Sequence, residues 1–374
     1  VTTISSNSDY YTGYLKIVYR VIFFNVLKRQ RNQSIHNIKT KTMNFKILLT
    51  FLMTIGFCSC NGQNTNANNI TTATPMPINR FDKALFQLIN SDDTTLNQQL
   101  LNQYPLMTEI LGKGILNMQS PEMPGFFNKL ENFYSEPTLK NLYADAIKKY
   151  DSVTETEQSL GNAFAWIQDK FPTMQIPALY MHVSGFNQNV LVGDSLLSLS
   201  IDKYMGEDYP LYQDFFYDYQ RRKMQPSHVV PDYIAGWLMS EYPFNGNENV
   251  LLDRMIYEGK IKYLVLSALP EMTPAALFGY TDEAWEWCKN NEANIWKAIV
   301  ERKHLYTPDQ MNTMKYFEDM PAQFLTSDAP GNIGSWVGLQ IIEQYIKETN
   351  TTPEALMKND NAQEILAASK YKGG

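Results

Sequence analysis

The sequence predicts an α+β fold that is mainly α-helical, with helices packed around a small sheet of three or four strands. Apolar residues recur three and four positions apart over most of residues 80–170 and 206–374, which is typical of helices with one buried face. Between these regions, residues 176–201 alternate or run in short apolar bursts. Because helices come first and strands later, without regular alternation, a doubly wound sheet is disfavoured. The chain is 44% apolar and 19% charged, so it can bury a large core.

The first helices are separated by prolines or by clusters of Asn and Asp, which interrupt helical periodicity. Each has apolar residues on one face, and the expected ranges are 81–89, 96–104, 124–134, 138–150 and 153–171. The strands are expected at 176–185, 189–193 and 195–201, because these runs are short and are bounded by Gly, Asn and Pro.

After Met205 the pattern is helical again, with helices expected near 211–223, 231–241, 248–269, 282–304, 331–348, 352–358 and 361–369. Pro231 suits the first turn of its helix, where a missing N–H costs nothing. Thr281 precedes two acids, and Asp328 precedes the helix near 331. Acids at these positions favour helix starts because they complement the positive end of the helix dipole.

Charge is unevenly distributed along the chain. Residues 1–60 contain eight Lys or Arg and a single acid, Asp9, whereas residues 61–374 contain 24 basic and 38 acidic side chains. The body therefore has a net charge near −14. Such a surface repels phosphate backbones, and no basic stripe with interleaved aromatic residues occurs in the sequence, so nucleic-acid binding is not expected.

Residues 43–59 have the pattern of a lipoprotein signal peptide. A cation at Lys46 precedes an apolar run about half as long as the ~20 residues that span a bilayer as a helix. The tetrapeptide at 57–60, Phe-Cys-Ser-Cys, resembles a bacterial lipobox. Cys60 is the expected lipid attachment site, because small Ser59 then lies just before the cut. The alternative is a plain secretory signal with two incidental cysteines.

The other segments near the N-terminus lack the pattern of a folded domain. Residues 1–42 precede a complete signal that has its own Met43, so we expect them to be a mis-called upstream start with no structural role. The apolar stretch at 14–27 is a poor candidate for a membrane-spanning helix, since two cations interrupt it. Residues 60–78 are rich in Asn and Thr and suit a flexible tether. Residues 79–374 are expected to form a single domain.

Two helical segments, VVPDYIAGWLMSEY and LLDRMIYEGKIKYLVL, have the order found in one large group of zinc peptidases. Those enzymes use a His-Glu-x-x-His helix, whose Glu is the general base, and take a third ligand from elsewhere. On this alignment the two His positions are Pro231 and Ala235, the base is Asp232, and the third ligand is Glu258. Both imidazoles are absent, so we expect no metal site. His228 lies four residues before Asp232, but a helix starting at Pro231 would not place the two on one face.

Asp232 and Glu258 are therefore interpreted as vestigial positions of a metal site. Two interpretations of Glu258 stay open. It is either an ordinary helix carboxylate paired with Arg254 or Lys262, each four residues away, or a buried group that retains a role from an ancestral site.

Two further segments have simpler explanations. In DAPGNIGSWVGLQIIEQYI, Gly334 and Gly338 lie on one helix face and would let another helix approach closely, whereas the spacing matches no phosphate loop. In residues 280–306, helical periodicity places Cys288 on a core face. Trp287 falls off that face and is a candidate contact patch for sugar or protein. No nearby cation or paired His supports a nucleophilic Cys288.

Seven ordered segments resemble the GldB-type gliding motility lipoproteins of Bacteroidota: INRFDKALF, PALYMHVSGFNQNVLVGDSLLSLSIDKYMG, VVPDYIAGWLMSEY, LDRMIYEGKIKYL, GYTDEAWEWCKNNEANIW, PGNIGSWVGLQIIEQYI and the terminal SKYK. The resemblance covers roughly residues 78–372. It implies an envelope lipoprotein associated with the gliding apparatus and with secretion machinery, and it implies no known reaction. The pattern is also distantly similar to gluzincin-type peptidases, whose His-Glu would stand at Pro231 and Asp232. This similarity implies a degenerate gluzincin-like core.

Together these observations predict a non-catalytic envelope lipoprotein, a pseudoenzyme that acts as a membrane-anchored binding or scaffold component and needs no cofactor. Its expected partners are other envelope proteins of motility or secretion. Its expected location is the outer membrane, facing the periplasm. The alternative is a zinc-dependent metallopeptidase or another periplasmic hydrolase of gluzincin-like fold.

Overall fold

The computed structural model describes residues 73–118 and 120–374, and it confirms an α+β, mainly helical fold. Its strands are β1 (Ile78–Asn79), β2 (Ala178–His182), β3 (Val190–Gly193) and β4 (Leu196–Ser200). They form one sheet with the order β1-β2-β4-β3. β2 runs parallel to both β1 and β4, whereas β3 is an antiparallel edge strand. All five residues of β4 are buried, because the sheet is covered on both faces.

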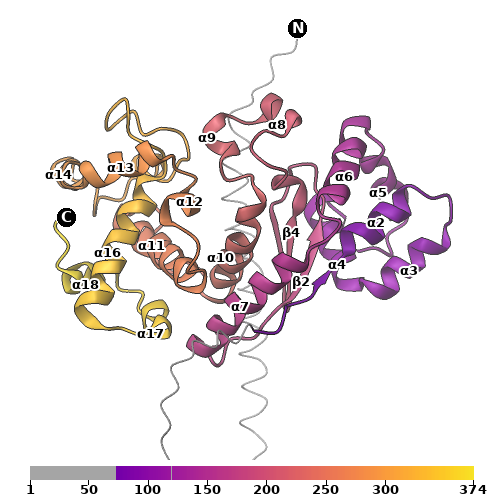
Figure 1. The fold of residues 1–374 in the computed structure, drawn as a ribbon, viewed down its shortest axis with the longest axis horizontal. Helices are drawn as coiled ribbons and strands as arrows, with labels where there is room; N and C mark the ends of the chain where they lie inside the picture. Colours follow the sequence, from indigo (N-terminus) through magenta and orange to yellow (C-terminus); the bar gives the residue numbers. More distant parts are fainter. Residues whose placement is uncertain (1–72, 119) are drawn as a thin grey trace, which may run out of the picture.

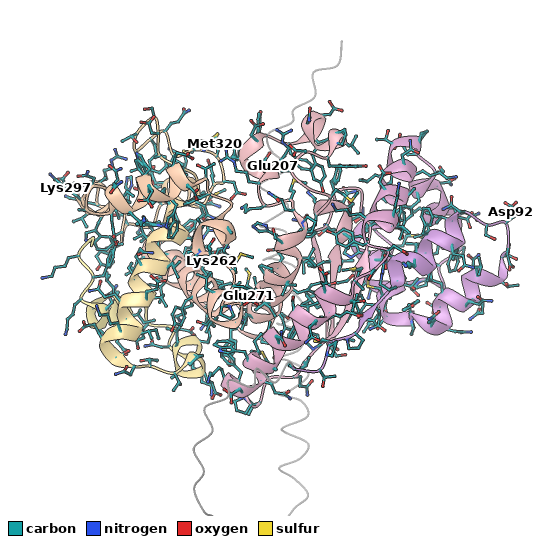
Figure 2. The ribbon with its side chains drawn as sticks, viewed as in Figure 1. Asp92, Glu207, Lys262, Glu271, Lys297 and Met320 are labelled. Atoms are coloured by element: carbon teal, nitrogen blue, oxygen red, sulfur yellow. The ribbon has the colours of Figure 1, made fainter. Side chains whose placement is uncertain are left out.

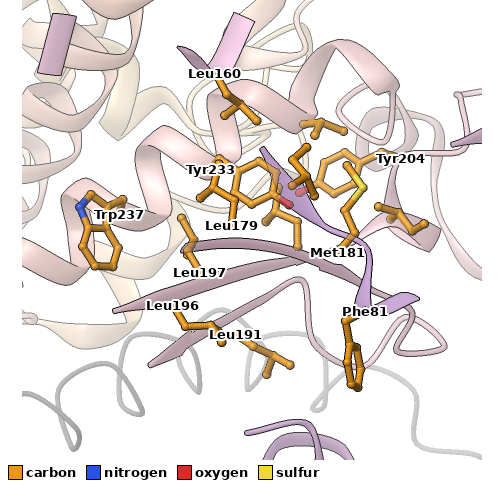
Figure 3. Packing of buried hydrophobic residues seen from close by; sticks show 14 of the residues in the cluster. Phe81, Leu160, Leu179, Met181, Leu191, Leu196, Leu197, Tyr204, Tyr233 and Trp237 are labelled. Atoms are coloured by element: carbon orange, nitrogen blue, oxygen red, sulfur yellow. The ribbon is translucent and has the colours of Figure 1, made fainter. Parts of the chain in front are cut away.

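Six helices separate β1 from the rest of the sheet: α2 (Phe81–Ile89), α3 (Thr95–Gln103), α4 (Pro105–Leu111), α5 (Phe126–Tyr134), α6 (Pro137–Lys149) and α7 (Thr154–Lys170). A π-helical turn, Gly112–Leu116, follows α4. In Figure 1 the helices α2–α6 are grouped to one side of the sheet, in indigo to magenta. Their apolar faces and the sheet form the first hydrophobic cluster, part of which is shown in Figure 3.

Eleven helices follow the sheet within the described residues: α8 (Pro210–Phe215), α9 (Asp218–Arg221), α10 (Val229–Glu241), α11 (Leu251–Ala268), α12 (Pro274–Phe278), α13 (Asp282–Asn290), α14 (Glu292–Glu301), α15 (Gln310–Lys315), α16 (Ile333–Thr349), α17 (Pro353–Lys358) and α18 (Ala362–Ser369). Short 3-10 turns occur at Ile201–Lys203 and Pro226–His228.

Helix α10 lies on the sheet. The Tyr233 hydroxyl donates a hydrogen bond to the Tyr180 carbonyl of β2, and the Trp237 indole N–H donates to the Gln175 carbonyl at 2.9 Å. Figure 3 shows Tyr233 and Trp237 directed toward the strands together with Leu179 and Leu197. These contacts fix the position of α10, whose other residues are available to face α11.

Helix α11 joins two hydrophobic clusters. Residues in its second half, including Leu264 and Val265, pack in the first cluster with the sheet. Residues in its first half, including Leu252 and Met255, pack in a second cluster formed with α13, α14, α16 and α18. In Figure 1 these later helices, in orange and yellow, lie on the opposite side of α10 from α2–α6.

Glycine packing brings α11 and α16 together, as the sequence predicts for Gly338. A Cβ built on Gly338 would lie 1.9 Å from the Met255 carbonyl oxygen, and one on Gly259 would lie 2.3 Å from Gly338 backbone atoms. Gly334 contacts a different partner, because a Cβ there would lie 3.0 Å from the Tyr316 carbonyl oxygen. The close approach therefore depends on Gly259 and Gly338.

Two predicted helices are interrupted in the structure. The segment expected at 211–223 is divided into α8 and α9 by extended backbone at Phe216 and Tyr217. The segment expected at 282–304 is divided at Asn291, whose side-chain amide donates to the Trp287 carbonyl at 2.9 Å. The two-residue strand β1 was not predicted.

No helix within residues 73–118 and 120–374 combines the length and the apolar character needed to cross a bilayer. The expected upstream segment 1–42, the signal peptide 43–59 and Cys60 lie outside the described residues.

Candidate functional site

Asp232 lies in the first turn of α10, where its carboxylate accepts a hydrogen bond of 2.6 Å from the buried hydroxyl of Tyr204. The helix begins two residues before Pro231, since a proline in the first turn removes no intrahelical hydrogen bond. The expectation that the helix starts at Pro231 is therefore wrong. His228 immediately precedes the helix; burial lowers the pKa of its ring, and the Asp232 carboxylate opposes that shift.

The His228 ring is held by a neighbouring helix. The side chain is buried, and its Nε2 lies 3.0 Å from the Ala276 carbonyl of α12, so this nitrogen is the donor of that hydrogen bond. Burial is the largest influence on the ring and lowers the pKa of His228. With Nε2 engaged as a donor, this nitrogen is not available as a metal ligand in the observed arrangement.

Neither expected partner pairs with Glu258. Arg254 lies over the ring of Phe317, 4.2 Å from its centroid, and Lys262 lies 5.4 Å from the centroid of Phe278. Within the described part of the chain, Glu258 forms no ion pair closer than 4 Å and no side-chain hydrogen bond. The interpretation of Glu258 as an ordinary ion-paired helix carboxylate is therefore not supported, while a retained role stays a hypothesis.

Lys262 is half-buried, and Figure 2 labels it near the middle of the molecule, where α11 lies beside α10. Loss of hydration lowers the pKa of its ammonium group, and the positive charge of Lys223 lowers that pKa further. The carboxylates of Glu258, Asp232 and Asp319 act against this shift, because each of them raises the pKa of Lys262. We refer to these neighbouring groups as the charge cluster, which consists of Lys223, His228, Asp232, Glu258, Lys262 and Asp319.

Two members of the charge cluster form an ion pair with each other. Lys223, which follows α9, donates to the Asp319 carboxylate at 2.5 Å, and Asp319 lies in the loop that precedes α16. The Lys223 stem packs against Gly279 at the end of α12, where a Cβ would lie 2.6 Å from Lys223 Cγ. Gly279 has a φ of +65°, so a side chain there would be strained as well as crowded. The cluster is thus assembled from α10, α11, the 3-10 turn that contains His228, and the two loops that contain Lys223 and Asp319.

The donor set does not fit a gluzincin-type zinc site. Pro231 and Ala235 carry no metal-binding atom, and the two carboxylates at Asp232 and Glu258 remain without the imidazole pair. Among residues 73–118 and 120–374 there is no group of three or more His, Cys, Asp or Glu side chains that could hold a metal ion. What the cluster does contain is two ammonium groups, Lys223 and Lys262, of which Lys223 is paired with Asp319.

The other candidate residues, Cys288 and Trp287, both contact the second hydrophobic cluster. Cys288 is fully buried, and burial raises the pKa of its thiol to about 12, so the reactive thiolate is strongly disfavoured. Trp287 packs against the second hydrophobic cluster and is partly buried, so the predicted exposed patch is wrong. Sequence reasoning missed the contributions of Lys223 and Asp319, since 96 positions separate these residues and no motif links them.

Comparison with known proteins places the chain in a family. A family model described as gliding motility protein GldB matches residues 62–373, which include the sheet, both hydrophobic clusters and the charge cluster. No curated protein and no solved structure matches the chain significantly. Because the match spans far more than half of the chain, this protein belongs to the GldB family of gliding motility lipoproteins.

Proposed function

We propose that this chain is a non-catalytic envelope lipoprotein of the gliding motility apparatus, acting as a membrane-anchored binding or scaffold component. The observation that carries the proposal is the family match, which begins at residue 62, two residues after the expected lipid attachment site at Cys60, and extends to residue 373. An anchor at Cys60 would leave the whole matched region outside the bilayer. Two or more acyl chains on this residue would hold the protein stably on a membrane surface.

The proposed location is the outer membrane, with the folded part in the periplasm, and the proposed partners are other envelope proteins of motility or secretion. A net charge near −14 over residues 61–374 favours protein partners over nucleic acid. The tether expected at residues 60–78 would link the lipid to the folded part, and its end packs against α7, where the Met76 N–H donates to the Glu157 carbonyl at 2.9 Å.

The arrangement of the charge cluster supports binding over catalysis. The two groups best suited to take up a proton are already in structural hydrogen bonds, Asp232 with Tyr204 and His228 with the carbonyl of Ala276. We propose that α10 and α11 are the degenerate core of a gluzincin-like scaffold, in which Asp232 and Glu258 occupy the former base and ligand positions.

Metal content and peptidase activity test this proposal against the metallopeptidase alternative. The purified chain, prepared without chelators, should contain far less than one zinc per molecule by elemental analysis and should cleave no generic peptide substrate. One zinc per chain, removable by a chelator together with a peptidase activity, would reverse the assignment. If zinc is bound but its removal changes no peptidase activity, the metal counts as surface-bound. The scaffold role then stands.

A further inference from the structure

A cavity lies where α14 ends and α15 begins, and no residue of the charge cluster lines it. Its volume is about 160 Å³. At ~30 Å³ for each water molecule in the liquid, this space is that of about five waters, so a carboxylate group fits inside. The lining comes from residues 302–304 and from four residues within 307–313. Figure 2 labels Lys297 of α14 at the outer edge of the molecule, so this helix is open to a partner from outside.

Lys303 stands in a backbone position that usually belongs to glycine. Its φ is +58°, and the chain leaves α14 at this residue. The Lys303 N–H donates to the Val300 carbonyl at 3.0 Å, and the His304 N–H donates to the Ile299 carbonyl at 3.1 Å. This pair of bonds closes a helix at a left-handed residue, which is most often Gly because a side chain is strained there. Ending the helix therefore gives no reason for a lysine, whose side chain lines the cavity.

Cations outnumber carboxylates in the cavity lining. Lys303 is exposed and forms no ion pair and no side-chain hydrogen bond in the part of the chain that the structure describes. Arg302 donates from Nη1 to the Phe324 carbonyl at 3.1 Å and retains its other donors. The carboxylate of Asp309 is engaged, because it accepts from the Asn312 N–H at 3.0 Å and from the Asn312 side-chain amide at 2.7 Å. Two cations against one carboxylate leave the lining with a net charge of +1.

His304 adds a neutral donor to this lining. Its Nδ1 lies 2.9 Å from the hydroxyl of the buried Tyr316. That hydroxyl has no other acceptor among the described residues, so it donates to Nδ1. Burial lowers the pKa of the His304 ring, and the charge of Arg302 lowers it further, so the ring is neutral near pH 7. Nε2 then carries the proton and can donate it to an acceptor in the cavity.

Exposed apolar side chains lie beside the lining residues in the sequence. Val300 is 48% exposed, Tyr306 is 54% exposed and Met311 is 72% exposed. Each of the three is within two positions of a residue that lines the cavity. Aromatic, Met and Arg side chains are enriched at protein interfaces. A small free anion would contact none of this apolar surface, whereas an acidic residue with apolar neighbours in a polypeptide would.

We propose that this cavity binds an acidic side chain, Asp or Glu, of a polypeptide partner. Arg302 and Lys303 would meet the carboxylate, and Val300, Tyr306 and Met311 would contact apolar residues beside it. This inference rests on the proposed function and deepens it, because it gives the binding component a docking site. A net charge of +1 matches the single negative charge of a carboxylate, whereas a phosphate group carries nearly two.

Nuclear magnetic resonance of the purified chain with ¹³Cε1-labelled histidine reports on the cavity. The His304 signal is assigned by its absence in His304→Gln, and the buried His228 provides the control signal. The probes are N-acetyl-Leu-Glu-Leu-amide, the same peptide with Gln in place of Glu, acetate and inorganic phosphate. We expect the Glu peptide to shift the His304 signal saturably, at least about tenfold more tightly than acetate or phosphate, and the Gln peptide to leave it unchanged.

Lys303→Gly separates binding from folding. The variant removes the charge and suits the left-handed backbone, so it should be at least as stable as the wild type while binding the Glu peptide about tenfold more weakly. Lys303→Arg keeps the charge and should bind within about threefold of the wild type. The matched control is Lys140→Gln, since Lys140 is exposed on α6, which lies on the other side of α10 from α14 in Figure 1. Its affinity should equal that of the wild type.

Equal affinities for acetate and the Glu peptide, or tighter binding of phosphate, would overturn the polypeptide partner. A His304 signal that moves no more than that of His228 with any probe would overturn the whole inference. Folded Lys303→Gly that binds the Glu peptide as tightly as the wild type would also contradict it. The proposed function would survive each of these results, because it depends on anchoring and on motility, which are measured separately.

Discussion

Helices α11 and α16 can pack closely because two glycines face each other, and Gly338→Ala should break that contact. The new Cβ would lie 1.9 Å from the Met255 carbonyl oxygen and 2.7 Å from its carbon. Backbone atoms cannot move out of the way by changing a rotamer. To reach an ordinary contact of about 3.4 Å the helices would have to separate locally by about 1.5 Å, which would loosen close packing on both sides of the interface.

The expected cost follows from two opposing effects. Overpacking a well-packed core costs about 1–3 kcal/mol and occasionally more, and a clash with backbone belongs at the upper end of that range. Replacing a helical glycine by alanine returns about 1 kcal/mol of helix propensity. We therefore expect Gly338→Ala to lower the free energy of unfolding by about 2 kcal/mol or more, which is a large fraction of an ordinary total of about 5–15 kcal/mol.

Urea unfolding monitored by tryptophan fluorescence measures this change, with Gly236→Ala as the matched control. Gly236 is also helical, but a Cβ there would meet only side-chain atoms of Val190 and Leu197, at 3.4 and 3.6 Å. The control should be unchanged or more stable by up to about 1 kcal/mol. If Gly338→Ala is as stable as Gly236→Ala, the close approach of α11 and α16 does not exist as described.

Four further predictions follow from individual side chains. Tyr204→Phe removes the hydroxyl that donates to Asp232 and should lower the urea-unfolding free energy by about 1.5 kcal/mol; an unchanged value would show that this hydrogen bond contributes nothing. Burial lowers the pKa of His182 to about 3, so the stability that depends on its neutral form is complete above pH 6.5 and is lost as the pH falls toward 3. His182→Gln should therefore flatten the pH dependence of unfolding in that window by up to about 1.4 kcal/mol per pH unit, and an equal slope in both proteins would contradict the assignment. The Cys288 thiol should resist a thiol reagent at pH 8 until urea unfolds the chain, as followed by mass spectrometry, whereas labelling of Cys288 in the native chain would contradict its burial. Cys60→Ala should move the protein from the membrane fraction to the soluble periplasm, and a variant that stays in the membrane with its leader uncut would contradict the lipobox.

The regular elements could be predicted because local periodicity encodes them. The segment FDKALFQLI was expected at 81–89 and forms α2 over the same residues, and the three expected strands contain β2, β3 and β4. The break between α8 and α9 could not be predicted in this way. Phe216 leaves the helix to pack against Phe186, with ring centroids 5.2 Å apart, and such a long-range contact overrides helical propensity.

The candidate site could be predicted only in part. The helix pair in the sequence identified Asp232 and Glu258, because both lie on long helices whose positions follow from periodicity. The groups that complete the charge cluster come from loops, and the Lys223–Asp319 pair links residues 96 positions apart. The position of the Lys262 side chain could not be predicted either. Its spacing from Glu258 predicts an ion pair, whereas in the structure it lies over the ring of Phe278.

Restoration of gliding by a chain that lacks the carboxylates of Asp232 and Glu258 tests the central claim most directly. The Asp232→Asn, Glu258→Gln double variant would be expressed in a gliding bacterium whose own family member has been deleted, and cell speed would be measured together with anchoring and abundance. Asn at 232 can still accept the Tyr204 hydrogen bond, so the fold should persist. A binding or scaffold component should restore at least about half of the wild-type speed. A folded, anchored variant that restores no movement would contradict the account, because loss of a catalytic base lowers rates by about 10²–10⁴ and a scaffold needs none.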